Sequence, residues 1–190
     1  MSPTPEQLQA EFAQLYPPAP APEETAPAAE APAADAAVPA PKPAAKPGPV
    51  LQTEPPFGAT VVNFAERGFH VDISIPAADV VAVAERLLAL EFSLDTMTGV
   101  DWQKLDQMEV VYDYLHFSNG LRLVVRCRVP RAEPELPTIS HLFQGANWHE
   151  RETHDFFGIR FSGHNNLTPF LLPEDATYHP LRKDFTGAPE

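Results

Sequence analysis

The chain has 190 residues and a formal net charge of −13, with 26 acidic and 13 basic residues. An acidic chain without a basic stripe repels phosphate, which argues against nucleic-acid binding. Its apolar runs are shorter than the roughly 18 residues of a membrane span, and its amino terminus lacks the basic and apolar pattern of a secretory signal. We therefore expect any link to a membrane to pass through another protein.

The single cysteine, Cys127, excludes an internal disulfide, a four-cysteine zinc site and a cysteine-held iron–sulfur cluster. Cys127 falls at an inward position of an alternating run over residues 121–129. We interpret it as a small buried residue of a strand, with a catalytic thiolate as the alternative.

The first 16 residues predict a short amphipathic helix over residues 6–16. Its apolar residues share one helical stripe: Leu8, Phe12, Leu15 and Tyr16. Pro17 and Pro18 end the pattern. A helix this short is marginal in water, so we expect it to dock on the rest of the protein.

Residues 17–56 differ in composition from the rest of the chain. They hold 13 proline and 13 alanine residues in 40 positions. Such a segment favours extended, solvated backbone and has too little apolar surface to offset its ordering entropy. It is predicted to be a disordered linker.

Residues 57–168 predict one α+β domain, a mixed or antiparallel sheet packed by helices. We expect strands at residues 60–64, 68–75, 108–117 and 121–129, and an amphipathic helix over residues 77–91. The inward side chains of that helix are Val80, Val83, Ala84 and Leu87. The pair Asn119–Gly120 predicts a hairpin between the last two strands.

Two further helices are predicted after a proline-rich loop at residues 130–137. Thr138 can cap the first, through about residue 143, and Asn147 can cap the second. Glu150 lies three residues after Asn147, as a capping-box partner would. Gly158 suits the left-handed position that ends a helix.

The second of these helices carries two histidines that resemble a zinc-protease motif. His149 and His154 stand five residues apart, about 140° out of register on a helix, so they do not form the required i,i+4 pair. We expect Glu150 to pair with His154 at that spacing instead.

The remaining acids of this helix allow two interpretations. Glu152 and Asp155 share a face and suggest an acid–base pair. Arg151, which can pair with Asp155, would keep both carboxylates ionised, so we favour a structural ion network. The aromatic residues Trp148, Phe156 and Phe157 are interpreted as core.

Residues 169–190 lose periodicity and mix proline, charge and isolated apolar residues. We expect an irregular arm that lies against its own domain or a neighbour. Leu181 and Phe185 are its predicted anchors. Arg182 and Lys183 are expected to meet an acidic partner surface.

Several sequence blocks together resemble one family. They are GANWHERE at 145–152, DFFGI at 155–159, GH at 163–164, LPED at 172–175 and HPLRKDF at 179–185, with TGVDW at 98–102. In this combination the chain resembles the 30 kDa subunit family of respiratory complex I, which is the C-type subunit of the proton-pumping NADH–quinone oxidoreductases. The resemblance covers about residues 61–185.

The resemblance implies a cofactor-free peripheral subunit with no catalytic or metal-binding residue of its own. FMN, the iron–sulfur clusters and quinone would be bound by partner subunits of a hetero-oligomer. The chain would pack on the 49 kDa-type quinone-site subunit, at the cytoplasmic side of the bacterial inner membrane. The partner-interface residues that it implies are Trp148, Glu150, Arg151, Glu152, Asp155, Gly158, His164, His179, Pro180, Leu181, Arg182, Lys183 and Asp184.

Departures from the family pattern leave the electron donor open. They are the Thr153–His154 pair, the Thr168–Phe170 segment and the proline- and alanine-rich insertion. Equivalent subunits serve membrane-bound hydrogenases and quinone oxidoreductases fed by ferredoxin or a deazaflavin. A free-standing acid–base enzyme that uses Glu152, Asp155 and His154 is the alternative from another class.

Overall fold

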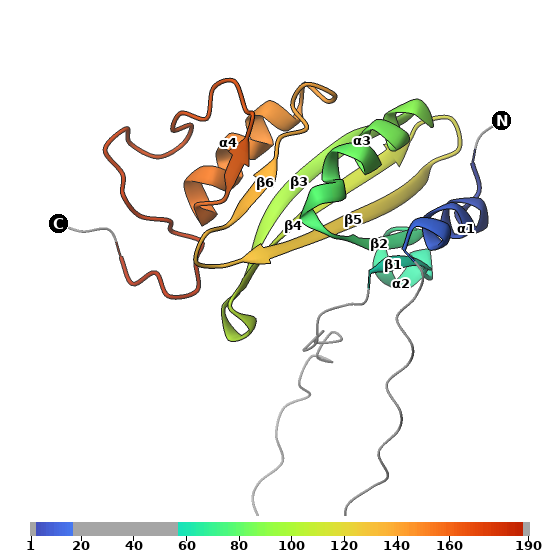
Figure 1. The fold of residues 1–190 in the computed structure, drawn as a ribbon, viewed down its shortest axis with the longest axis horizontal. Helices are drawn as coiled ribbons and strands as arrows, with labels where there is room; N and C mark the ends of the chain where they lie inside the picture. Colours follow the sequence, from blue (N-terminus) through green and yellow to red (C-terminus); the bar gives the residue numbers. More distant parts are fainter. Residues whose placement is uncertain (1–2, 17–56, 188–190) are drawn as a thin grey trace, which may run out of the picture.

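The computed structural model describes residues 3–16 and 57–187, so the predicted linker at 17–56 lies outside the described residues. Figure 1 shows a five-stranded sheet with helices α3 (Val80–Ala89) and α4 (Ala146–Phe157) over one of its faces. The strand order is β1 (Gly58–Val61), β2 (Val71–Ile75), β5 (Leu121–Pro130), β4 (Gln107–His116) and β3 (Phe92–Trp102). Every neighbouring pair is antiparallel except β2 and β5, which are parallel. This mixed sheet confirms the predicted α+β class.

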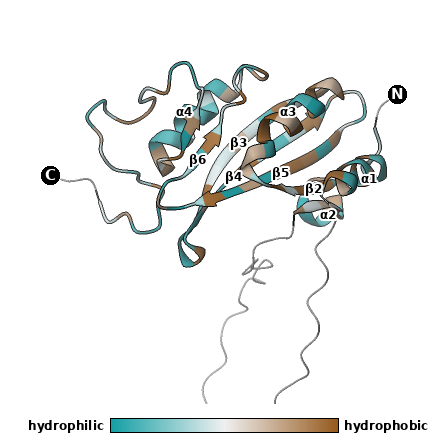
Figure 2. Ribbon diagram, in the orientation of Figure 1, coloured by the Kyte–Doolittle hydropathy of each residue, from teal (hydrophilic) through white to brown (hydrophobic). Residues whose placement is uncertain are grey.

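The hairpin of β4 (Gln107–His116) and β5 (Leu121–Pro130) forms the centre of the sheet. Its turn is closed where predicted, because Gly120 takes a left-handed φ of 69° and the Asn119 side chain accepts a bond from the Leu121 N–H at 3.0 Å. Apolar and polar residues alternate along these strands in Figure 2. The inward side chains of β5 are buried as predicted: Leu121, Leu123, Val125, Cys127 and Val129.

Burial also decides the state of Cys127. Desolvation raises the pKa of its thiol to about 12, and the nearby carboxylates act in the same direction. A thiol that stays protonated at neutral pH is a poor nucleophile. The structure therefore supports the interpretation of Cys127 as a core residue.

Helix α3 (Val80–Ala89) follows the short 3₁₀ turn η1 (Ala77–Asp79). It buries the four side chains that the sequence predicts: Val80, Val83, Ala84 and Leu87. Its amphipathic pattern is regular, and the structure agrees with it.

The start of the domain differs from the prediction. β1 (Gly58–Val61) and helix α2 (Phe64–Arg67) replace the strand expected at 60–64. Asn63 caps α2 through a bond from the Ala65 N–H, and Gly68 ends it in the left-handed region. The following strand, β2 (Val71–Ile75), therefore begins later than predicted.

Strand β3 (Phe92–Trp102) was not predicted at all. Its register with β4 shifts between Leu94 and Thr96. Such a bulge breaks the period-two alternation on which strand prediction depends.

A small parallel sheet of β6 (Glu135–Pro137) and β7 (Arg160–Ser162) stands beside the main one. The predicted loop at 130–137 thus includes a strand. The helix predicted at 138–143 is wrong, since the chain makes turns there. The Thr138 hydroxyl is directed to Glu150 rather than to a helix end.

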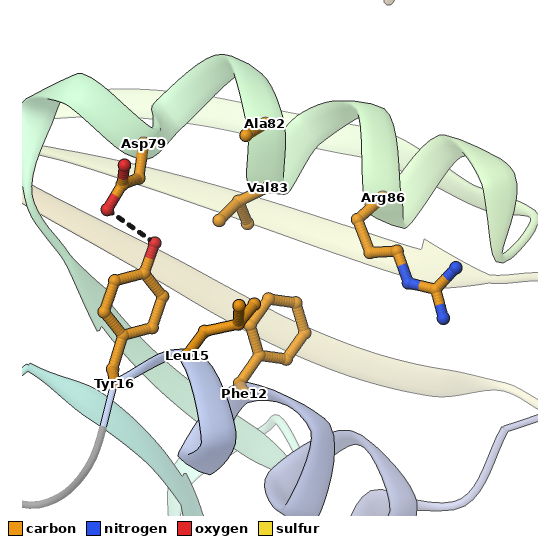
Figure 3. Close-up of a pocket in the computed structure, with 7 residues that line it drawn as sticks. All are labelled: Phe12, Leu15, Tyr16, Asp79, Ala82, Val83 and Arg86. Carbon is orange, nitrogen blue, oxygen red and sulfur yellow. Dashed lines mark hydrogen bonds between the residues drawn. The ribbon is translucent and has the colours of Figure 1, made fainter.

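Helix α1 (Pro5–Leu15) docks on the domain, as expected for so short a helix. Thr4 and Gln7 form a capping box, and Leu8 and Phe12 are buried. A groove of about 210 Å³ remains between α1 and α3, and Figure 3 shows the Tyr16–Asp79 hydrogen bond at one end of it. Arg86, at the other end, forms an ion pair with Glu11.

Leu15 departs from the predicted stripe, because 61% of its surface is exposed. This difference gives a matched pair of variants. Phe12→Ala should weaken the docking of α1 by about 3 kcal/mol, because it removes a fully buried ring. Leu15→Ala should cost less than about 0.5 kcal/mol.

Hydrogen exchange of the α1 amides and urea unfolding would measure both effects. Protection that falls equally in the two variants would show that α1 is not held by the Phe12 contact.

Candidate functional site

Helix α4 (Ala146–Phe157) carries the segment that the sequence singles out. It lies against β3 through Phe157, whose ring would be only 2.6 Å from a Cβ at position 99. Gly99 therefore permits this close approach. Helix α4 begins after Gly145, which offers no side-chain cap, so the capping box of Asn147 and Glu150 is wrong.

Glu150 faces inward and is fully buried. Its carboxylate accepts bonds from the Thr138 hydroxyl and from the Ile139 N–H, the latter at 2.8 Å. Burial raises the pKa of Glu150 to about 7, although these two bonds oppose the shift. Glu150 thus fixes the chain before α4, and its predicted pair with His154 does not form.

His164 lies beside Glu150, with its Nε2 atom 3.8 Å from the carboxylate. Its Nδ1 accepts the Asn166 N–H, so Nε2 carries the proton and faces the Asn147 carbonyl at 3.3 Å. Burial lowers the pKa of His164. A neutral imidazole therefore accompanies Glu150 at neutral pH.

Asp155 binds the arm. One oxygen of its carboxylate, Oδ2, accepts three consecutive backbone N–H groups, from Phe170 at 2.8 Å, Leu171 at 2.7 Å and Leu172 at 3.2 Å. Burial alone would raise the pKa of Asp155, but these donors hold it below its ordinary value. The predicted Arg151–Asp155 pair is replaced by this bond to the arm.

The arm returns to α4 at Gly158. His179 donates through Nδ1 to the Asp155 carbonyl at 2.8 Å, and Arg182 donates through Nε to the Phe157 carbonyl at 2.7 Å. A Cβ at position 158 would lie 2.5 Å from His179 Nε2. Glycine is required here for its φ of 74°, as predicted, and also for the room that it leaves.

A second buried acid holds the end of the arm. Asp101 of β3 accepts Arg131 Nε at 2.9 Å and Arg131 Nη2 at 3.1 Å, and also the Lys183 N–H at 2.7 Å. Arg131 bonds Asp184 at 2.7 Å as well. Burial opposes the ionisation of Asp101, but these donors keep its pKa low.

The outer face of α4 is different, because its large side chains are open to solvent. Trp148 is 53% exposed, so its interpretation as core is wrong. Its ring lies 5.0 Å from that of Phe170. Arg151 lies over both rings and donates to the Thr168 and Pro169 carbonyls at 3.1 and 2.9 Å.

The remaining predicted site residues lie near the surface. Glu152 approaches His149 at 3.9 Å and does not join an ion network with Asp155. Leu181 is 51% exposed and is not an anchor within this chain, although its N–H bonds the Phe156 carbonyl. Phe185 stacks on Tyr178 at 5.6 Å. Pro180 is half-buried between these contacts.

Sequence reasoning missed three residues that support these contacts, Asp101, Arg131 and Thr138. Asp101 stands in the TGVDW block, where an acid between apolar strand residues was the available signal. Nothing local to Arg131 or Thr138 reveals partners that lie 30 and 12 residues away.

The cavity beside the arm is small. The cavity between α4 and the arm, lined by His154, Tyr178 and His179, measures about 60 Å³. Organic ligands occupy sites of roughly 300 Å³ or more. Nowhere in residues 3–16 and 57–187 do three or more metal-ligating side chains gather, and no helix there is long and apolar enough to cross a membrane. The contacts of Asp155, His179 and Arg182 hold the arm against α4.

These features define a small α+β domain that holds its own irregular arm through hydrogen bonds from α4 and β3, an arrangement that we call the clamp. Residues 73–190 match the model of the family described as respiratory-chain NADH dehydrogenase, 30 kDa subunit, and the chain belongs to that family.

Two curated relatives and one solved structure are similar to the chain. It is 46% identical over 98 residues to the C-type subunit of the NADH-quinone oxidoreductase of Herpetosiphon aurantiacus, covering 51% of this chain and 57% of the relative. It is 38% identical over 103 residues to the C-type subunit of the F(420)H(2) dehydrogenase of Methanosarcina mazei, covering 53% and 65%. A chain of the archaeal membrane-bound sulfane sulfur reductase superposes with a TM-score of 0.57 at 28% identity, covering 60% and 71%.

The matched part thus spans between about half and two thirds of these two curated relatives.

Asp155 provides the first test of the clamp. Asp155→Ala leaves three backbone N–H groups without their acceptor, so the arm should loosen, at a cost of about 2–3 kcal/mol. Limited proteolysis should then cut residues 168–187 faster than in the wild type. Asp175→Ala, an exposed acid of the same arm, is the control. Equal cutting of the two variants would contradict the clamp.

Glu150 makes stability depend on pH. Its folded pKa of about 7 exceeds its ordinary value of 4.5, so the folded state binds more protons between these values. Its contribution is therefore present below pH ~4.5 and is lost as the pH rises toward ~7, by roughly 3 kcal/mol at most.

Urea unfolding across pH 4–8 should show this slope in the wild type and in Glu152→Gln, and a reduced slope in Glu150→Gln. The lowered pKa of His164 makes stability rise with pH below pH ~6.5, opposite to the effect of Glu150. This contribution is present in all three proteins, so it does not affect their comparison. An unchanged slope in Glu150→Gln would show that Glu150 titrates normally.

Proposed function

We propose that the chain is a cofactor-free peripheral subunit of a proton-translocating NADH–quinone oxidoreductase. The observation that carries the proposal is the family match over residues 73–190, which includes the whole clamp of α4 and the arm. In this role the chain supports electron transfer from NADH through FMN and iron–sulfur clusters to quinone, all bound by other subunits. The isolated chain performs no chemical step.

The proposed partner is the 49 kDa-type quinone-site subunit, within a hetero-oligomer. Support comes from the surface around the clamp, where Trp148, Leu171 and Leu181 are each more than half exposed. Large apolar residues held at a surface mark contact sites for other proteins. Residues that hold the arm inside the chain, such as Asp155 and Asp101, would fix the shape of that contact surface.

The proposed location is the cytoplasmic side of the bacterial inner membrane, reached through partner subunits. The role as a non-catalytic subunit is supported by the small cavity at the clamp and by the engagement of Asp155 with backbone donors. A carboxylate held ionised by three N–H groups is a poor proton donor, so the acid–base enzyme of the alternative interpretation is disfavoured.

A second candidate is the equivalent subunit of a related complex with another electron donor. It is favoured by two observations: the 38% identity to a subunit of an F(420)H(2) dehydrogenase and the structural match to a sulfane sulfur reductase. Membrane-bound hydrogenases and ferredoxin-fed quinone oxidoreductases belong to the same group of candidates.

Purification of the native complex through a tag on this chain should distinguish the candidates. We expect the tag to retrieve a 49 kDa-type subunit together with subunits that bind FMN and NADH, and the eluate to reduce quinone with NADH. Retrieval of a deazaflavin- or hydrogen-oxidising subunit instead would support the second candidate. Retrieval of the chain alone, with turnover by the chain itself, would contradict both.

A further inference from the structure

The outer face of α4 and the start of the arm form an exposed aromatic surface, which we call the platform. It consists of Trp148, Arg151, Phe170 and Leu171. Trp148, Phe170 and Leu171 are 53%, 36% and 55% exposed. Tryptophan and arginine are the residues that most often dominate the energy of protein interfaces.

Hydrogen bonds from α4 fix the backbone of the arm residues in the platform. Asp155 fixes the backbone of Phe170 and Leu171 through their N–H groups, at 2.8 and 2.7 Å. Arg151 fixes the preceding backbone through the carbonyls of Thr168 and Pro169. The backbone that carries Phe170 and Leu171 is therefore fixed in place. A surface ordered in advance loses little entropy when a partner binds.

The charge of the platform is not neutralised. Arg151 lies 5.3 Å from the ring centroid of Trp148 and 5.0 Å from that of Phe170. Its hydrogen bonds go to two carbonyls and the Thr168 hydroxyl, all uncharged acceptors. No carboxylate in the described part of the chain makes an ion pair with it, in a protein whose net charge is −13.

The neighbouring acids of α4 make their nearest contacts with other groups. Asp155 accepts three backbone donors, and Glu152 approaches His149 at 3.9 Å. Glu150 is directed into the interior. A half-buried guanidinium between two rings therefore retains N–H groups and charge for a carboxylate from outside the chain.

We propose that the platform docks a segment of a neighbouring subunit that presents an Asp or Glu carboxylate beside a large aliphatic side chain. The carboxylate binds Arg151, and the aliphatic side chain packs on Trp148 and Leu171. The proposal rests on the proposed function, because it requires a partner subunit. It assigns the contact to outward residues of α4 and of the start of the arm, and Asp155 holds the backbone of Phe170 and Leu171 beneath them.

The test uses the full chain in its native membrane complex. Trp148→Ala and Arg151→Glu should each lower the amount of partner that co-purifies, on the order of tenfold or more. Arg151→Lys keeps the charge but loses the planar donors, so its effect should be smaller. Phe117→Ala is the matched control, since Phe117 is 75% exposed at the tip of the β4–β5 hairpin.

Cross-linking from position 148 in the complex should identify the contacted segment, and it should contain an acid. Reversal of that acid to Arg in the partner should restore assembly with Arg151→Glu. A slope of binding against salt concentration that is lost in Arg151→Gln would support the ion pair.

Three outcomes in the complex, and one with lipid vesicles, would contradict the proposed docking. Those in the complex are wild-type assembly in both Trp148→Ala and Arg151→Glu, an equal loss in Phe117→Ala, and cross-links only to a second copy of this chain. Binding of the free chain to anionic lipid vesicles through Trp148 would contradict it too. If the wild-type tag retrieves no redox subunit, the proposed function itself fails, which is a different result from normal retrieval by the variants.

Discussion

The structure depends on buried carboxylates that accept hydrogen bonds from irregular backbone. Chain without helix or strand leaves N–H groups that must find acceptors, and burying them unpaired costs about 1–3 kcal/mol each. Asp155 accepts three such groups, while Glu150 and Asp101 each accept one. All three acids are buried. Acidic residues can therefore be buried in this core, because they supply the acceptors that irregular backbone lacks.

Two of these acids, Glu150 and Asp155, lie on helix α4, and their pKa values shift in opposite directions. Glu150 is fully buried, which raises its pKa to about 7 even though two hydrogen-bond donors act in the opposite direction. Asp155 has three backbone donors on a single oxygen, and its pKa falls. Burial therefore outweighs the donors at Glu150, whereas the donors outweigh burial at Asp155. The cavity that adjoins Asp155 holds only about 60 Å³. Glu150 binds the turn before α4, and Asp155 binds the arm that follows the helix.

Local patterns predicted the regular part of the fold and not the site. The buried faces of α3 and β5 follow from periodicity alone, because their apolar residues recur at the spacing of a helix and of a strand. Strand β3 escaped because its bulge breaks that repeat. Within the candidate site, Gly158 was predicted from its backbone preference, whereas Trp148 was assigned to the core because aromatic residues usually are buried. Thr138 was predicted to cap a helix, since its true partner, Glu150, belongs to an element that local spacing does not connect to it.

The arm and α1 represent two ways of attaching a segment that the sheet does not require. The arm is held by carboxylates, and its contacts are directional and mostly polar. Helix α1, which lies outside the family-matched residues 73–190, is held mainly by Leu8 and Phe12, each worth about 1.5–3 kcal/mol when buried. The groove of about 210 Å³ beside α1 shows that its packing against α3 is incomplete. The arm, by contrast, is bonded to its own domain at both α4 and β3, so it presents a fixed surface to any partner.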